Sequence, residues 1–166
     1  VEDIIGLGYK DHSLPGNGID PDNDDESFII IDNGLPILGM FQPDAIASIM
    51  VDDVPYLLTA NEGDAREYIA ETDEATCTTL GGEFDDGECL VYTDETEVGD
   101  VVLDPSFFPE AEIIQELASG LKITNDAPQN AAGEYQALLS YGARSFSIWN
   151  GNSGELIYDS EDDLEQ

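Results

Sequence analysis

The chain of 166 residues carries 38 Asp and Glu residues against 4 Lys and Arg, a formal net charge of −34 at pH 7. Such a charge repels nucleic acid and anionic membranes, so it excludes both as simple electrostatic partners and favours cations. Hydrophobic residues still make up 41% of the sequence, enough for one domain with a core. No apolar stretch approaches the roughly 20 residues of a membrane span, so direct membrane insertion is not expected.

Short apolar runs separated by turn residues predict mostly β-structure. A strand ends within "DIIGLG", a turn-rich acidic loop follows, and "SFIIID" predicts the next strand. The runs "IASIMV" and "YLLTA" flank a tight acidic turn and predict a β-hairpin. Near the end of the sequence, "LLSYG", "RSFSIWN" and "ELIYDS" predict further strands in the same arrangement, with "GNSG" as the last turn.

One helix is predicted, over Pro109–Ser119. Proline occupies its first turn, acidic residues lie near its start, and Ile113, Ile114 and Leu117 share one face. Gly120 is expected to end this helix. Short strands with long loops and one helix indicate an all-β fold, a sandwich or a propeller, although the sequence contains no clean internal repeat.

The two cysteines, Cys77 and Cys89, lie close together in a Gly-rich segment. With His12 as the single histidine, they cannot supply the four ligands of a Cys/His zinc site. A Cys77–Cys89 disulfide is favoured over two free thiols because of the close spacing and the turn residues between them. Such a bond is typical of an extracellular or cell-surface setting. We interpret 69–97 as an acidic, disulfide-containing surface insertion in a single domain spanning 1–166.

The segment "DPDNDDE" places carboxylates at alternate positions, Asp20, Asp22 and Asp24, with Glu26 following. Oxygen ligands on a tight loop can converge on one Ca²⁺. The match to the helix–loop–helix calcium pattern is poor, because Asp25 stands where that pattern has Gly. The alternatives are a solvated acidic loop without an ion, and a surface adapted as a whole to high salt.

The four basic residues are Lys10, Arg66, Lys122 and Arg144. Because positive charge is so rare, each is expected to have a structural or functional task. We interpret Arg66 and Arg144 as ion-pair anchors, since a guanidinium group can bind carboxylates bidentately. The alternative is that both hold a phosphate beside a bound metal, as in a phosphoesterase. The metal ligands would then be four polar side chains, Asp11, His12, Glu62 and Asp64.

Six segments, in order along the chain, resemble a known family. They are "GYKDHSLPGNGID", "GMFQPDAIAS", "YLLTANEGDARE", "VVLDPSFFP", "LKIT" and "YGARSFSIWNGNSGELIYDSEDDLE". The chain is similar to the choice-of-anchor I domain proteins over nearly its whole length, apart from the region around Cys77–Cys89. The resemblance implies a partial β-propeller, a segment of several blades that further blades or other chains complete.

The same family includes secreted proteins and mesenchyme-specific cell-surface glycoproteins, and some bacterial relatives carry an alkaline-phosphatase label. The sequence therefore predicts a secreted or cell-surface, calcium-binding structural or interaction module, as part of an extracellular assembly or a mineral-associated matrix. Two alternatives stay open. One is a metal-dependent, alkaline-phosphatase-like phosphoesterase, and the other is a salt-adapted acidic protein with no specific metal site.

Overall fold

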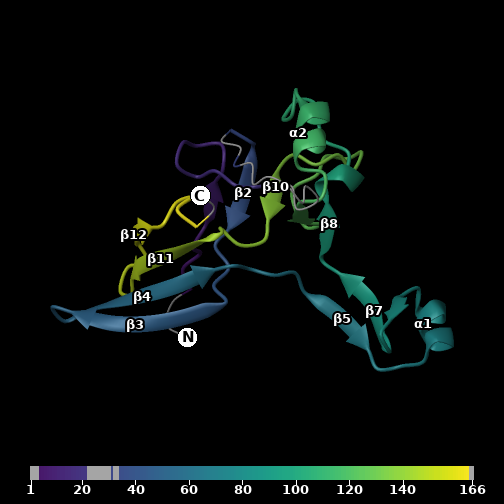
Figure 1. Ribbon diagram of the computed structural model, residues 1–166, viewed down its shortest axis with the longest axis horizontal. Helices are drawn as coiled ribbons and strands as arrows, with labels where there is room; N and C mark the ends of the chain where they lie inside the picture. The colour runs from purple at the N-terminus through teal and green to yellow at the C-terminus, as the bar shows by residue number, and fades with distance from the viewer. Residues whose placement is uncertain (1–3, 22–30, 32–33, 165–166) are drawn as a thin grey trace.

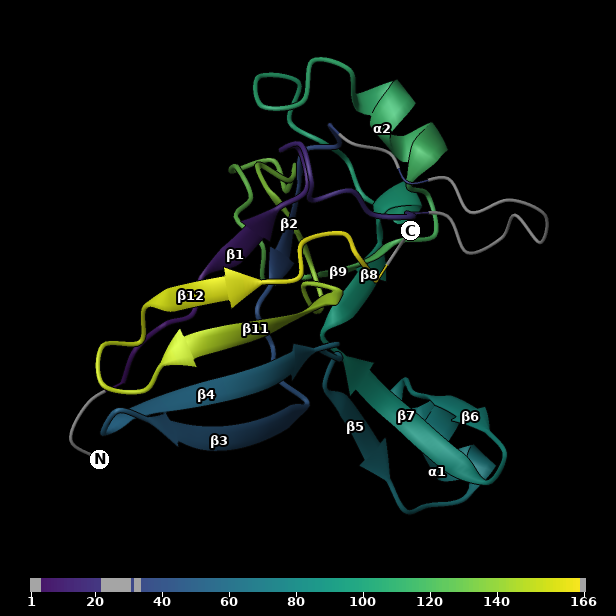
Figure 2. The same cartoon turned by 60° about the vertical axis from the view of Figure 1, so that its left-hand side comes forward.

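A computed structural model describes residues 4–21, 31 and 34–164 of the chain. It contains twelve strands in three sheets and two α-helices (Figures 1 and 2). The predicted all-β fold with a little helix is therefore confirmed at this level. Among the described residues, no helix is both long enough and apolar enough to cross a membrane.

The first sheet has five short strands and carries the hydrophobic core. Its spatial order is β1 (Tyr9–Asp11), β2 (Ile37–Met40), β10 (Leu138–Ser140), β9 (Lys122–Thr124) and β8 (Glu95–Glu97). The β2–β10 pair is parallel and the other pairs are antiparallel. Buried side chains from these strands, among them Ile37, Leu138 and Ile123, pack in one core cluster with Phe108 and with Ile114 of the second helix.

The predicted helix near 109–119 is confirmed as α2 (Ala111–Leu117). Its buried side chain is Ile114, while Ile113 and Leu117, which were expected on the same face, are exposed. Gln115 fixes the helix to the short 3-10 turn Val98–Asp100. Its Nε2 donates to the carbonyl oxygens of Val98 and Val101, at 3.1 and 2.7 Å. These hydrogen bonds to backbone carbonyl oxygens therefore help to hold α2 in place, a role that we expected apolar side chains alone to fill.

The second sheet has four antiparallel strands, in the order β12 (Leu156–Asp159), β11 (Ser145–Asn150), β4 (Val54–Asn61) and β3 (Ala45–Val51). The predicted β3–β4 and β11–β12 hairpins are confirmed. Asp52 and Asp53 form the first turn with φ of 49° and 63°, the left-handed conformation that two-residue hairpin loops require. The strand from "LLSYG", β10, belongs to the five-stranded sheet instead.

The two faces of the four-stranded sheet differ in an unusual way. The strand register puts Thr59 beside Ser147 on one face, and this face is polar and buried. Leu58, Phe146 and Tyr158 lie on the other face and are exposed, and the rings of Phe146 and Tyr158 are 5.7 Å apart. The sheet therefore presents an apolar surface to solvent and keeps hydrogen-bonding groups inside.

The third sheet stands apart from the other two, at the lower right of Figure 1. Its order is β5 (Glu67–Ala70), β7 (Glu88–Thr93) and β6 (Glu83–Asp85), and α1 (Glu74–Leu80) packs on it. The predicted Cys77–Cys89 disulfide is confirmed and joins α1 to β7, with both cysteines fully buried. We call residues 66–94 the disulfide lobe.

Helix α1 was not predicted, because turn residues lie between the cysteines and we interpreted 69–97 as an acidic surface insertion. Local capping explains it. The Asp73 side chain accepts from Thr76 N at 2.8 Å, and Gly81 ends the helix with a φ of 76°. Cys77 is its buried residue, so the disulfide takes the place of the apolar stripe that identifies most helices. The predicted strand "SFIIID" falls almost entirely outside the described residues.

Loss of the disulfide should destabilise the lobe. The bond closes a loop of sequence separation 12, for which chain entropy predicts about 3 kcal/mol of stabilisation. We expect the Cys77→Ala/Cys89→Ala variant to unfold at lower urea concentration and to be cleaved faster by protease within 66–94. The variant should be insensitive to dithiothreitol, and this serves as the control. Equal protease sensitivity of oxidised and reduced wild type would contradict the expectation.

Candidate functional site at the crossing of two arginine-bearing segments

Two segments that each carry an arginine cross beside the four-stranded sheet. One follows β4 and contains Gly63, and the other precedes β11 and contains Gly142. Both glycines have positive φ, 66° and 71°, and a Cβ atom on Gly142 would lie 1.6 Å from the carbonyl oxygen of Glu62. The backbone nitrogens of Ala143 and Arg144 both donate to the Asn61 carbonyl oxygen, at 2.9 and 3.1 Å. The Asn61 carbonyl oxygen therefore positions both segments through two hydrogen bonds.

A buried polar network lies under this crossing, on the inner face of β4 and β11. Asn61 is its centre. Its Oδ1 accepts from the Thr59 hydroxyl at 2.8 Å, and its Nδ2 donates to the hydroxyls of Ser145 and Ser147, at 3.1 and 2.7 Å. Trp149 Nε1 donates to the Thr59 hydroxyl at 2.9 Å. Each of these polar side chains has a hydrogen-bond partner within the network, so their burial leaves none of them unsatisfied.

The network ends on a buried ion pair. The hydroxyls of Ser145 and Ser147 donate to Asp159 Oδ2, at 2.8 and 2.6 Å. The other oxygen, Oδ1, is 3.2 Å from Lys10 Nζ, whose side chain is only 3% exposed. Lys10 Nζ also donates to the carbonyl oxygen of Glu161. Because Lys10 belongs to β1 and Asp159 to β12, the pair joins the five-stranded sheet to the four-stranded sheet.

This network was not predicted from the sequence. The sequence contains one sign of it. Thr59 and Asn61, and likewise Ser145 and Ser147, are two residues apart, which places each pair on one face of its strand, while the intervening residues are apolar or exposed. Such alternation normally indicates that the polar residues lie on the solvent-facing side of a strand. Here the polar side faces inward.

Arg66 pairs with Asp94 where the two ends of the disulfide lobe meet, and we call this pair the neck of the lobe. The sequence did not point to Asp94 as its partner. Arg66 Nε lies 2.8 Å from Asp94 Oδ2, and the Arg66 backbone nitrogen donates to Oδ1 at 2.7 Å. Tyr141 donates its hydroxyl to the Asp94 backbone carbonyl oxygen at 2.5 Å, and the same hydroxyl lies 3.1 Å from Oδ1. Arg66 immediately precedes β5 and Asp94 immediately follows β7, so the pair holds the two ends of the lobe together and Tyr141 attaches them to the body.

The ionisation of the neck follows from these contacts. Burial opposes ionisation of Asp94, but hydrogen bonds from Arg66 and Tyr141 and the charge of Arg66 outweigh it, so the pKa of Asp94 is lowered. The pKa of Arg66 is raised, chiefly by its hydrogen bond to Asp94. Burial, assisted by Asp94, raises the pKa of Tyr141 to about 12. At neutral pH the neck is therefore a charged pair with a protonated phenol donor.

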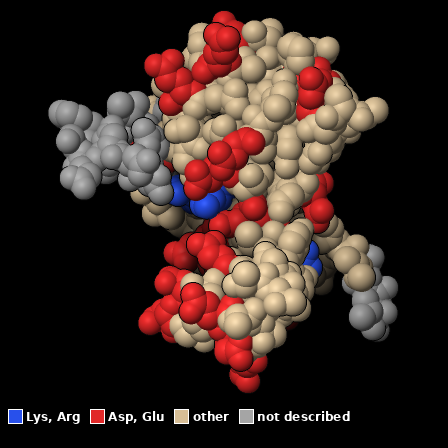
Figure 3. All heavy atoms as spheres, turned by 90° about the vertical axis from the view of Figure 1, so that its right-hand side faces the viewer, with Lys and Arg blue, Asp and Glu red and all other residues tan. Residues whose placement is uncertain are grey.

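Lys122 has a comparable role at the edge of the five-stranded sheet. Its Nζ lies 3.0 Å from Glu97 Oε1 and 3.4 Å from Glu95 Oε1, across the β8–β9 pair. The hydrogen bond to Glu97 is the main reason why the pKa of Lys122 is raised. Acidic side chains form several patches on the face shown in Figure 3, where basic side chains occupy only small areas. The contacts of Lys10, Arg66 and Lys122 place these cations against carboxylates of the fold itself.

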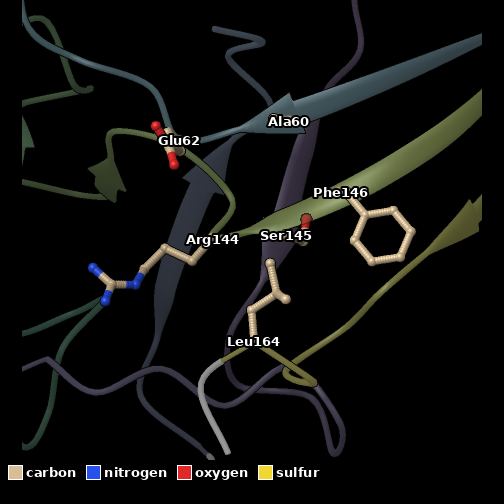
Figure 4. Close-up of a pocket in the computed structure, with 6 residues that line it drawn as sticks. All are labelled: Ala60, Glu62, Arg144, Ser145, Phe146 and Leu164. Atoms are coloured by element: carbon tan, nitrogen blue, oxygen red, sulfur yellow. The ribbon is translucent and has the colours of Figure 1, made fainter. Parts of the chain in front are cut away.

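The two predicted arginine anchors line different open pockets. Arg144 borders a pocket of about 380 Å³ with Ala60, Glu62, Ser145, Phe146 and Leu164, and its guanidinium points away from Phe146 and Leu164 (Figure 4). The backbone of Arg144 is left-handed, with a φ of 47°. Arg66 borders a second pocket of about 390 Å³. Its polar lining includes Gln42, Asp64, Asp94, Thr124, Asp126 and Tyr141.

The structure does not bring together the four side chains considered as phosphoesterase metal ligands. Glu62 and Asp64 line different pockets. Asp11 accepts from the backbone nitrogen and the hydroxyl of Ser13, at 2.9 and 2.6 Å, and His12 is fully buried with Nδ1 against a backbone carbonyl. Within the described ranges, no group of three His, Cys, Asp or Glu side chains could hold a metal ion.

The calcium site considered in the acidic loop stays a prediction. Asp20 is half-buried, whereas Asp22, Asp24 and Glu26 lie outside the described residues.

The neck should contribute stability that depends on pH. Because the folded-state pKa of Asp94 is lowered, its contribution is complete above the unfolded value of about 4 and disappears as pH falls through the folded value. We expect Asp94→Asn to lower the urea midpoint at pH 7 and to lower it less at pH 3, which is below the unfolded pKa of Asp94. Asp86→Asn, which removes one charge from an exposed turn, serves as the control. An Asp94→Asn deficit of the same size at both pH values would contradict this account.

The family model for the choice-of-anchor I domain matches residues 1–166, the whole chain. Neither the curated proteins nor the solved structures gave a match. The family name indicates a surface-anchor or extracellular module. Because this family model matches the whole chain, the chain belongs to the choice-of-anchor I domain family.

Proposed function

We propose that this protein is a secreted or cell-surface structural or interaction module that binds calcium and takes part in an extracellular assembly or a mineral-associated matrix. The observation that carries the proposal is the placement of the basic side chains. Lys10, Arg66 and Lys122 neutralise carboxylates inside the fold or along a sheet. The net charge of −34 therefore has to be balanced by cations or basic groups from outside the chain.

Two further features support an extracellular setting. The Cys77–Cys89 disulfide suits an oxidising compartment, and choice-of-anchor I membership fits a surface module. Calcium is abundant in extracellular fluids, where modules with Kd values of about 10⁻⁴ to 10⁻³ M bind it through carboxylate and carbonyl oxygens. The acidic loop from Asp20 to Glu26 is the proposed site.

The four-stranded sheet supports the proposal that the chain is a segment of a propeller. A propeller blade is a four-stranded antiparallel sheet, and β12-β11-β4-β3 has this composition. Its exposed face, with Leu58, Phe146 and Tyr158, offers an apolar surface of the kind that a neighbouring blade covers. Remaining blades or other chains are the proposed partners. The disulfide lobe, which overlaps the proposed insertion 69–97, stands outside this unit.

Calcium should raise the thermal stability of the full chain. At about 2 mM CaCl₂ and constant ionic strength, a site with a Kd near 10⁻⁴ M raises Tm by roughly 4–7 °C through mass action. The measurement is calorimetry with CaCl₂, with NaCl of equal ionic strength, and with chelator. An unchanged Tm in calcium would contradict the proposal.

Two matched variants separate a specific site from general acidity. Asp20→Asn/Asp22→Asn/Asp24→Asn/Glu26→Gln removes four carboxylates of the acidic loop. Glu83→Gln/Asp85→Asn/Asp86→Asn/Glu88→Gln removes four carboxylates from the β6–β7 turn. The calcium shift should disappear in the first variant and persist in the second. Equal loss in both, or an equal shift in NaCl, would favour a salt-adapted surface with no specific site.

A further inference from the structure

The described sheets protect all of their edges except one. The edge strands β1, β5, β6, β8 and β12 have only three or four residues, and each includes at least one Asp, Glu or Lys. Short length and charge are the usual devices that stop an edge from pairing with another chain. Strand β3 is different. It has seven residues, "AIASIMV", with no charge and no proline.

The free edge of β3 is fully accessible along its length. Every residue of the strand is exposed, and among the described residues β4 is its single neighbour in the sheet. Ile46 and Met50 project on one face and are 66% and 62% exposed; Ile49 and Val51 project on the other and are 52% and 48% exposed. Figure 2 shows β3 as the outermost strand of its sheet. Its outward backbone amides and carbonyls form a ready template for one more strand.

Charge decides what kind of strand fits this edge. Exposed carboxylates lie at both ends of β3, with Asp44 directly before it and Asp52 and Asp53 directly after it. A second copy paired along β3 in either direction would place Asp beside Asp at both ends, in addition to the repulsion between two chains of charge −34. A strand with basic residues at its ends would instead be attracted at both ends.

We propose that β3 is a docking edge for an extended segment of another protein, with alternating apolar side chains and Lys or Arg on both flanks. Strand addition supplies affinity through main-chain hydrogen bonds, and the flanking charges fix register. A partner run of about seven residues, roughly 23 Å long, matches β3. This inference rests on the proposed interaction role, but it does not depend on calcium, so failure of the calcium shift leaves it standing.

The direct test uses a fluorescent synthetic peptide, seven alternating Val and Thr residues between two Lys pairs, titrated with the full chain. We expect saturable binding by anisotropy. A peptide with Glu pairs in place of Lys should not bind. Methylation of alternate backbone amides keeps the charge but removes strand pairing, and should weaken binding at least ~10-fold. Equal binding of the methylated peptide would show attraction by charge alone and overturn the proposal.

Variants of the chain locate the binding edge. Asp44→Asn/Asp52→Asn/Asp53→Asn should weaken binding at least ~10-fold, and Asn tolerates the positive φ at the two turn positions. The control Asp85→Asn/Asp86→Asn/Glu88→Gln removes the same charge from the β6–β7 turn and should bind like wild type. Ile46→Lys, which gives β3 the charge that the other edges have, should abolish binding. Unchanged binding by Ile46→Lys, or equal weakening in the control, would overturn the proposal.

Self-association is the remaining outcome of the test. Sedimentation of the wild-type chain without peptide should show no oligomer that depends on β3. A dimer that Ile46→Lys dissociates would identify a second copy as the occupant and overturn the proposed heterologous partner.

Discussion

The buried ion pair between Lys10 and Asp159 is the interaction on which the arrangement of the two larger sheets depends. It joins β1 of one sheet to β12 of the other, and Asp159 also accepts the hydroxyls of Ser145 and Ser147. Through Asn61, these hydroxyls are connected to the crossing of the two arginine-bearing segments. Removal of either charge would leave the other buried without its partner, which typically costs far more than the pair contributes over apolar residues.

Pairing with carboxylates of the fold also explains the positions of two other basic side chains, Arg66 and Lys122. Lys10 joins two sheets, Arg66 closes the neck of the disulfide lobe, and Lys122 spans the carboxylates of β8. Each is placed where its side chain offsets local carboxylate repulsion, so the outer surface is left to external cations and basic partners. The acidic surface and the internal ion pairs both follow from the placement of these few cations. The proposed calcium binding and the proposed docking of a strand with basic flanks rest on the same placement.

Features encoded by neighbouring residues could be predicted from the sequence. The β3–β4 hairpin follows from two apolar runs around Asp52 and Asp53, and the disulfide from the spacing of two cysteines with Gly between them. Features that depend on distant residues could not. The partner of Arg66 is 28 residues away, and Asp159 lies far from Lys10 in the chain. Helix α1 was missed because its stability comes from two caps and a disulfide instead of an apolar stripe. The inward polar face of β11 resembles an ordinary exposed face until the register is known.

A double-mutant cycle on Lys10 and Asp159, with the free energy of unfolding measured in urea at neutral pH, shows whether this ion pair holds the two sheets together. We expect Lys10→Met and Asp159→Asn each to cost about 3–5 kcal/mol, and the double variant to cost much less than the sum. Single variants within about 0.5 kcal/mol of wild type, or strictly additive costs, would contradict this expectation, because the pair would then not hold the sheets together.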